Sequence, residues 1–364
     1  MVFVQLAEVL MSPMFVPGPV DVDEAVLLAQ SQPMVPHRSQ EFEDLYRRTR
    51  SKAQPLFATQ AQVFIVTSSG TGLQEAAVRN LVKRDLLSCI NGAFSQRWYD
   101  VAMTNAKQTD RLDADWGQPI LPELVADALS KKKYELITLV HNETSTGVQN
   151  PVQEIAAVVH EISPDTLICI DAVSSLAGVK MEMDAWGLDM VLTSSQKCLA
   201  LPPGLALAAV SERALTYAKE VPERGWYFDL VRMEAHLNKD STPATPAMSL
   251  IYALETQLDR IQAEGLENRF SRHSAMAKYV QDWVPANGFD VFAQDGYRSN
   301  TVTAVKNDPS LDFEELNSFL ISRGMRIANG YGQLRGKTFR IAHMGETQLA
   351  DIKNLFAAIE DFIA

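Results

Sequence analysis

The chain has 364 residues, which exceeds the size at which a single hydrophobic core usually stops growing, so we expect one large domain with a smaller one packed against it. Hydrophobic residues make up 46% of the sequence and charged residues 21%, a composition typical of globular rather than disordered proteins. The formal net charge of -12 disfavours binding to nucleic acid or to an anionic membrane, and no apolar run approaches the roughly 20 residues of a membrane helix.

The cysteines and the N-terminus favour a cytoplasmic location. Cys89, Cys169 and Cys198 are an odd number without metal-ligand spacing, and they suit a reducing interior. Residues 1–14 lack the basic region and the small-residue cleavage site of a secretory signal. We therefore expect a cytoplasmic protein whose N-terminal segment, residues 1–20, packs on a partner subunit and on the active site.

From Gln62 onward, short apolar runs alternate with amphipathic segments. The predicted strands are 63–66, 86–90, 136–140, 167–170, 190–193 and 206–210, and the predicted helices among them are 73–83, 94–106 and 152–162. This alternation is typical of crossover units that build a parallel sheet buried on both faces. After residue 242 the pattern changes to a long helical stretch from 248 to about 283, then strand, helix, strand and a final helix. We place a large domain at residues 21–245 and a small one at 246–364.

Ligands of open α/β sheets bind at the carboxyl ends of the strands, so the polar turns there are where chemistry is expected. The first such turn, Ser68-Ser69-Gly70-Thr71-Gly72, follows strand 63–66. Its glycines let an anion approach the backbone, and the free N–H groups and the positive helix end favour a phosphate. The turn lacks the Gly-Lys-Ser/Thr ending of a nucleotide P-loop, and an ordinary strand-to-helix turn with a serine cap is the alternative.

Two charged residues follow buried strands. Asp171 ends strand 167–170, where a carboxylate needs a partner and a protonated pyridine nitrogen would serve; a helix cap is the alternative. Lys197 follows strand 190–193, and burial there would lower the pKa of its amine and suit it to Schiff-base formation. A further polar turn, residues 141–147, could bind a phenolic oxygen or a substrate, or could be a plain Ser/Thr-rich turn.

Taken together, these segments resemble the class V aminotransferases of fold type I, specifically the alanine/serine–glyoxylate (serine–pyruvate) aminotransferase group. The matching segments occur in the same order over nearly the whole chain: Pro17-Gly18-Pro19, His37-Arg38-Ser39, Ser69-Gly70-Thr71-Gly72, residues 142–147, residues 171–175, Ser195-Gln196-Lys197 with Pro202-Pro203-Gly204, residues 242–245 and residues 340–345. The resemblance implies an α/β protein of the PLP-dependent transferase fold type I, with a mainly parallel seven-stranded sheet in the large domain and a smaller C-terminal α/β domain.

The resemblance also implies that the cofactor is pyridoxal 5'-phosphate (PLP). Lys197 would hold it as a Schiff base and then move the proton between the substrate Cα and the cofactor C4'. Asp171 would pair with the pyridine nitrogen. Val173 would pack beneath the ring, and Phe94 would stack on its other face. Thr144 would hydrogen-bond the phenolic oxygen.

The remaining contacts implied by the resemblance concern the phosphate and the substrate. Ser69, Gly70 and Thr71 would bind the phosphate through their backbone N–H groups, with Gln196 beside it. Thr245 of the partner subunit would reach the same phosphate, which implies a homodimer with shared active sites. Arg340 would bind the substrate α-carboxylate through two donors, and the backbone near Gly18 would lie over the substrate.

The function implied is transfer of an amino group from L-serine or L-alanine to glyoxylate or pyruvate by a ping-pong mechanism. A class V transaminase for another amine, such as 2-aminoethylphosphonate or ureidoglycine, stays open, although Arg340 favours a donor with a carboxylate. A cysteine desulfurase is disfavoured because Gln196 rather than histidine precedes Lys197 and no cysteine follows Cys198. A non-catalytic member of the fold would typically lack Lys197, Asp171 or Arg340.

Overall fold

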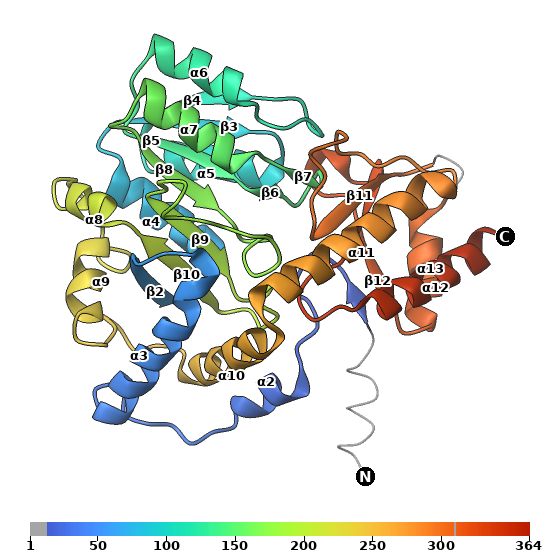
Figure 1. Ribbon diagram of the computed structural model, residues 1–364, viewed down its shortest axis with the longest axis horizontal. Helices are drawn as coiled ribbons and strands as arrows, with labels where there is room; N and C mark the ends of the chain where they lie inside the picture. Colours follow the sequence, from blue (N-terminus) through green and yellow to red (C-terminus); the bar gives the residue numbers. More distant parts are fainter. Residues whose placement is uncertain (1–12, 309–310) are drawn as a thin grey trace.

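The computed structural model of the protein describes residues 13–308 and 311–364, and its centre is a seven-stranded sheet (Figure 1). The strand order is β2-β10-β9-β8-β5-β3-β4. The strands are β2 (Gln62–Thr67), β3 (Asp85–Ile90), β4 (Gln108–Asp113), β5 (Leu136–Val140), β8 (Leu167–Asp171), β9 (Met190–Ser194) and β10 (Leu205–Val210). Only β10 runs antiparallel to its neighbours, β2 and β9. The predicted fold class, with a mainly parallel seven-stranded sheet, is confirmed.

Helices follow most of these strands. They are α4 (Gly70–Leu81), α5 (Ala93–Thr104), α6 (Pro122–Lys131) and α7 (Val152–Ile162). Strand β4 and helix α6 were not among the predicted elements. Strand β4 lies at the sheet edge, and all six of its residues are exposed or only half-buried, so its sequence, Gln-Thr-Asp-Arg-Leu-Asp, contains no apolar run.

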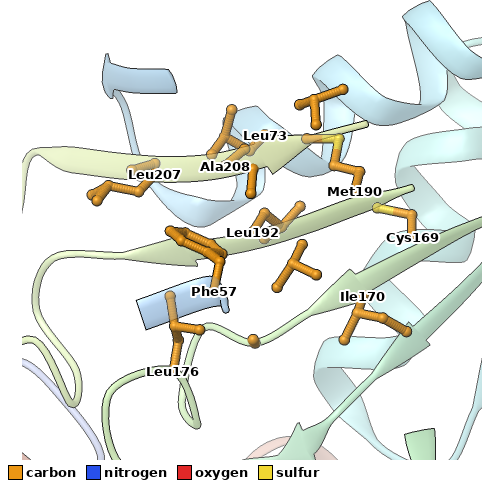
Figure 2. Close-up of a cluster of buried hydrophobic side chains, with 14 of the residues drawn as sticks. Phe57, Leu73, Cys169, Ile170, Leu176, Met190, Leu192, Leu207 and Ala208 are labelled. Carbon is orange, nitrogen blue, oxygen red and sulfur yellow. The ribbon is translucent and has the colours of Figure 1, made fainter. Parts of the chain in front are cut away.

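The strands in the middle of the sheet are buried on both faces. Every residue of β5, β8, β9 and β10 is buried, which explains why they appear in the sequence as continuous apolar runs. Figure 2 shows Leu73 of α4 with Leu192 and Leu207 of the sheet in one hydrophobic cluster. This packing fixes the positions of the strand ends and of the polar turns that follow them.

The remaining helices of this layer pack around the sheet. They are α2 (Glu24–Ala29), α3 (Gln40–Ala53), η1 (Gln54–Phe57), α8 (Glu212–Ala218), α9 (Leu230–Leu237) and α10 (Met248–Glu264). The predicted helical stretch 248–283 consists of two helices, because Gly265, with φ of 80°, separates α10 from α11 (Leu266–Ala286).

Two separate hydrophobic cores divide the chain. Leu258 and Ile261 of α10 belong to the core of the large sheet, whereas Met276 and Val280 of α11 belong to the second core. The two cores therefore separate between Ile261 and Met276, later in the chain than residue 245. The proposed domain boundary itself stays a prediction.

A smaller sheet lies at one end of the molecule (Figure 1). Its strands are, in order, β1 (Met14–Phe15), β12 (Arg326–Asn329), β13 (Thr338–Ala342) and β11 (Val302–Lys306). Helices α12 (Phe313–Ser322) and α13 (Leu349–Ile363) lie with this sheet, and the short 3-10 helix η2 (Gly332–Leu334) follows β12. Strand β1 pairs in parallel with β12, so the start of the described chain joins this second sheet. The first part of the predicted N-terminal segment, residues 1–12, lies outside the described residues. Within residues 13–308 and 311–364, the structure contains no helix with the length and apolarity needed to cross a membrane.

One buried carboxylate fixes the start of α5. The hairpin of β6 (Asn142–Glu143) and β7 (Val148–Gln149) places Glu143 under this helix with no exposed surface. The Glu143 carboxylate accepts hydrogen bonds from the backbone N–H groups of Phe94 at 3.2 Å and Ser95 at 2.8 Å. Gly92, the residue before the helix, contributes no side-chain cap, and a Cβ there would lie 2.3 Å from Glu143 Cγ. Glu143 therefore takes the place of the missing cap.

Replacing Glu143 by glutamine is expected to lower the free energy of unfolding by about 2 kcal/mol or more, because an amide N–H would face backbone N–H donors that now bind a charge. Urea unfolding followed by circular dichroism measures the loss. The matched control is Glu161→Gln on the exposed end of α7, where a change below about 0.5 kcal/mol is expected. Equal losses in the two variants would contradict the capping role.

Candidate active site

A cavity of about 310 Å³ lies at the carboxyl ends of the central strands. Nine of the ten residues predicted to bind the cofactor line it: Ser69, Gly70, Thr71, Phe94, Thr144, Asp171, Val173, Gln196 and Lys197. Its size is that of a site for a small molecule or cofactor. The structure therefore brings together residues that are up to 128 positions apart in the sequence, from Ser69 to Lys197.

The N-terminus of α4 forms one end of the cavity. Helix α4 begins at Gly70, three residues before the predicted start, so the turn expected to bind an anion is the first turn of the helix. Ser69 precedes it in extended conformation and does not cap it with its side chain. A Cβ at Gly70 would lie 2.7 Å from Val173 Cγ2, so glycine keeps the backbone open here. Free N–H groups at a helix N-terminus suit a phosphate.

Ser194 adds an unsatisfied group at the same end. Its hydroxyl is buried and has no hydrogen-bond partner in the described part of the chain. It lines the cavity, 3.7 Å from the position that a Cβ of Gly70 would occupy. A ligand oxygen at this end of the cavity would satisfy the hydroxyl.

Lys197 is buried under the N-terminal segment. Its Nζ donates a hydrogen bond to the carbonyl oxygen of Pro17, and the N–H of Val20 donates to the carbonyl oxygen of Gln196 at 3.3 Å. Gly18, with φ of 89°, lies so close that a Cβ there would be 2.6 Å from Lys197 Cδ. Burial, followed by the charge of Arg340, lowers the pKa of Lys197 to about 8. The amine is therefore available in its neutral form close to neutral pH.

Asp171 is 4% exposed and accepts three hydrogen bonds. The backbone N–H of Val173 donates to Oδ1 at 2.9 Å. The Gln74 amide donates to Oδ2 at 2.8 Å, and the Trp98 indole donates to the same oxygen at 3.1 Å. Burial raises the pKa of Asp171, and the donors act against that rise.

The sequence analysis did not identify Gln74 and Trp98 as site residues. Gln74 comes four residues after Gly70, and Trp98 comes four residues after Phe94. Side chains at this spacing lie on the same face of a helix. That spacing, counted from the predicted cofactor contacts, is the signal that could have found them.

Aromatic and cationic groups cover the wall formed by α5. The ring of Phe94 lines the cavity and stacks with the ring of Tyr331 at a centroid distance of 5.2 Å. The Arg97 guanidinium lies 5.0 Å from the centre of the Phe94 ring, and its Nη1 is 3.5 Å from Thr71 Oγ1. Arg97, which the sequence analysis did not single out, thus places a permanent positive charge on the cavity wall.

Arg340 lies beside the cavity and contacts Thr144, one of the lining residues. Its guanidinium donates to the carbonyl oxygen of Asn329 at 3.0 and 3.1 Å, and its Nη1 lies 3.5 Å from the carbonyl oxygen of Thr144. Its side chain is largely buried, and burial lowers its pKa to about 10. The Thr144 hydroxyl donates to Ser174 Oγ at 2.8 Å. Because these partners of Arg340 are neutral carbonyl groups, its charge can still attract a carboxylate.

Thr245 is the one predicted cofactor contact that lies elsewhere. With Thr242, it lines a separate hollow of about 40 Å³ next to Thr67 and Tyr227. Its expected place is in the active site of the partner subunit, and that stays a prediction.

The residues around the cavity fit the cofactor that the sequence resemblance implies. A helix N-terminus suits the phosphate, a buried aspartate suits a protonated ring nitrogen, and a buried lysine of lowered pKa suits the aldehyde. Phe94 and Val173 offer two surfaces between which a flat ring can lie. Nine of the ten residues predicted to hold pyridoxal phosphate thus surround one cavity.

Comparison with known proteins agrees with this fit. The model of the family described as aminotransferase class-V matches residues 25–336. The chain is 33% identical to L-aspartate–glyoxylate aminotransferase of Paracoccus denitrificans, over 92% of this chain and 86% of that protein. It is 32% identical to serine–glyoxylate aminotransferase of Arabidopsis thaliana, over 95% of this chain and 89% of that protein.

A solved structure shows the same architecture. The crystal structure of alanine–glyoxylate aminotransferase from Nostoc sp. matches with a TM-score of 0.91 and 27% identity, over 96% of this chain and 95% of that chain. The family match spans most of the sequence, and both of the relatives named above exceed 30% identity over nearly all of it. The protein therefore belongs to the class V aminotransferases of fold type I, enzymes that use pyridoxal phosphate.

Proposed function

We propose that the protein transfers the amino group of a small amino acid, L-serine or L-alanine, to glyoxylate or pyruvate by a ping-pong mechanism. The observation that carries the proposal is that Lys197 and Asp171 line one cavity with the N-terminus of α4, while Arg340 lies beside it. The three relatives described above differ in the donor that their names give, and all three names include glyoxylate. Glyoxylate is therefore the acceptor with the most support.

The cavity residues would hold the cofactor as follows. Ser69, Gly70 and Thr71 present backbone N–H groups to the phosphate, and Gln196 lies beside it. Asp171 accepts the N–H of the pyridine ring. Phe94 and Val173 would cover its two faces, and the Thr144 hydroxyl would reach the phenolic oxygen. When bound, the cofactor supplies an electron sink for the electron pair left after a proton leaves the substrate Cα.

Lys197 would act first as the covalent anchor and then as the acid and base. Its amine would hold the cofactor through the aldehyde carbon, with loss of water, until the amino group of the donor takes its place. The free amine would then take the proton from the substrate Cα and return it at C4'. A pKa of about 8 lets Lys197 both accept and donate a proton near neutral pH. Pro17 and Gly18 cover the amine and limit its access to water.

Arg340 would bind the α-carboxylate of the substrate. The hydrogen bonds of its guanidinium go to the neutral carbonyl oxygens of Asn329 and Thr144, so a carboxylate can exchange with them and gain two charge-assisted hydrogen bonds. The planar pair of donors matches a carboxylate better than a phosphonate. The donor 2-aminoethylphosphonate is therefore the less favoured alternative, whereas ureidoglycine, which carries a carboxylate, stays open.

Arg97 favours L-aspartate as a second candidate donor. A second permanent cation on the cavity wall can attract the side-chain carboxylate of such a donor, in addition to the α-carboxylate at Arg340. The Paracoccus relative carries L-aspartate in its name.

The visible spectrum of the PLP-loaded protein tests the function. L-serine or L-alanine is expected to convert the bound cofactor to pyridoxamine phosphate, and glyoxylate is expected to restore the original absorbance. L-aspartate is added in parallel to rank the second candidate. The variant Arg340→Gln is expected to need donor concentrations about 100-fold higher, through the loss of two charge-assisted hydrogen bonds. Arg335→Gln, on the exposed surface nearby, is the matched control. An absorbance that none of the three amino acids changes would overturn the proposed donors.

The pKa of Lys197 gives a pH prediction. Only the neutral amine adds to an aldehyde, so the rate at which the apoprotein captures PLP is expected to rise with pH and to level off above about pH 8. Stopped-flow absorbance between about pH 6 and about pH 9.5 measures this rate. The Lys197→Ala variant controls for reversible binding without the covalent bond. A capture rate that is constant over this range would contradict the lowered pKa.

We further propose a homodimer in which Thr245 of the partner subunit completes the phosphate site. Each site would then use Lys197 from one chain and Thr245 from the other. Two inactive variants, Lys197→Ala and Thr245→Glu, are expected to recover about a quarter of the parent activity when they are unfolded and refolded as an equal mixture, because half of the dimers are mixed and have one intact site of two. Each variant refolded alone is the control. A mixture without recovered activity would argue that each chain builds its own site.

A further inference from the structure

Asp171 lines the cavity, and its carboxylate has one acceptor position that no residue of the described ranges fills. Each carboxylate oxygen has two lone-pair positions. Oδ2 receives both the Gln74 amide and the Trp98 indole, so its positions are filled. Oδ1 receives the N–H of Val173, which leaves one position. The proposed function therefore requires Oδ1 to be the atom that meets the ring nitrogen of the cofactor.

The two side-chain donors come from the two helices that begin at the cavity. Helix α4 starts with Gly70 at the phosphate end and carries Gln74 one turn later. Helix α5 begins where the Glu143 carboxylate accepts the backbone N–H of Phe94, whose ring lies on the cavity wall. It carries Trp98 one turn later. In both helices the turn that would bind the cofactor is followed by the turn that binds Asp171.

Both donors are themselves buried. Gln74 is 3% exposed and Trp98 is 1% exposed. An indole N–H can only donate, so Trp98 needs an acceptor in the interior, and Asp171 Oδ2 supplies it. The contact is thus required by both sides, which makes the position of the carboxylate well defined.

The burial of Asp171 makes these donors necessary. Burial and the charge of Glu143 raise the pKa of Asp171, while the hydrogen bonds from Val173, Gln74 and Trp98 lower it. The other titratable groups with which Asp171 interacts are Lys197 and Cys169, and burial keeps the Cys169 thiol neutral by raising its pKa. Without the side-chain donors, the balance would move towards the protonated carboxylic acid, which cannot hold a proton on the ring nitrogen.

We propose that Trp98 and Gln74 are positioning residues that keep Asp171 ionised and direct its Oδ1 to the ring nitrogen of the cofactor. This inference rests on the proposed function, in which Asp171 accepts the pyridine N–H. The hydrogen bonds act through Asp171, so their loss changes the protonation of the ring nitrogen and not only the stability of the fold.

Nitrogen-15 NMR of the protein loaded with PLP labelled at the ring nitrogen tests the inference. Trp98→Phe keeps an aromatic ring and removes only the N–H donor. The ring nitrogen is expected to lose its proton at a pH lower by about one unit or more than in the parent protein, the effect of one charge-assisted hydrogen bond. The matched control is Trp186→Phe, since the Trp186 indole N–H is buried and has no partner in residues 13–308 and 311–364. This control is expected to leave the titration unchanged.

Two further variants keep the outcomes distinct. Gln74→Leu removes the second donor and replaces Trp98→Phe if that variant does not fold; it is expected to shift the titration in the same direction. Asp171→Asn tests the assignment on which the inference rests. If Asp171→Asn shifts the titration but Trp98→Phe and Gln74→Leu do not, the positioning role is wrong and the role of Asp171 stands. If Asp171→Asn also leaves the titration unchanged, the proposed cofactor contact is wrong as well.

Discussion

The burial of one carboxylate, that of Asp171, organises the active site. An aspartate at the end of a fully buried strand is costly unless donors surround it. The chain supplies these donors from α4 and α5, the two helices whose first turns border the cavity. Stabilising Asp171 therefore also fixes Gly70 and Phe94. The predicted phosphate end, the stacking surface and the acid partner of the ring become parts of one rigid unit.

A second buried carboxylate, that of Glu143, holds the start of helix α5 in place. Glu143 satisfies the N–H groups at the start of the helix where Gly92 contributes no side chain. The hairpin β6–β7 that carries Glu143 also places Thr144 beside Arg340. The cofactor wall and the predicted carboxylate site are thus connected through adjacent residues of a short hairpin.

The substrate end of the site depends on segments outside the large sheet. Arg340 lies on β13 of the smaller sheet, and Pro17 and Gly18 follow β1, which pairs with β12 of that sheet. The N-terminal segment crosses from this second sheet to Lys197, so the amine is covered by a part of the chain 180 residues away in the sequence. In the proposed function, substrate binding and protection of the lysine both require the two sheets to hold their relative position.

Several features of the structure could not be predicted from local patterns. Strand β4 is an exposed edge strand, so no apolar run marks it. The long helical stretch contains Gly265, and only its backbone conformation shows that the chain starts a new helix there. Arg97, which lines the cavity, donates a hydrogen bond to the Tyr331 hydroxyl although the two residues are 234 positions apart. The edge position of β4 and the contact of Arg97 with Tyr331 depend on the rest of the fold, whereas the break at Gly265 lies in the backbone of that segment.

The sequence by itself determined the α/β fold class and the central strands, because buried parallel strands appear as apolar runs followed by short polar turns. Its resemblance to the class V aminotransferases pointed to ten cofactor contacts, nine of which line the cavity. Only the tertiary structure decided which side chains meet Asp171. Gln74 is 97 residues before Asp171 and Trp98 is 73 residues before it, so no local pattern pairs them. They meet because parallel strands bring their carboxyl ends to one edge of the sheet. Each helix that starts there carries, one turn after its cofactor contact and on the same face, a donor that reaches the buried Asp171 carboxylate.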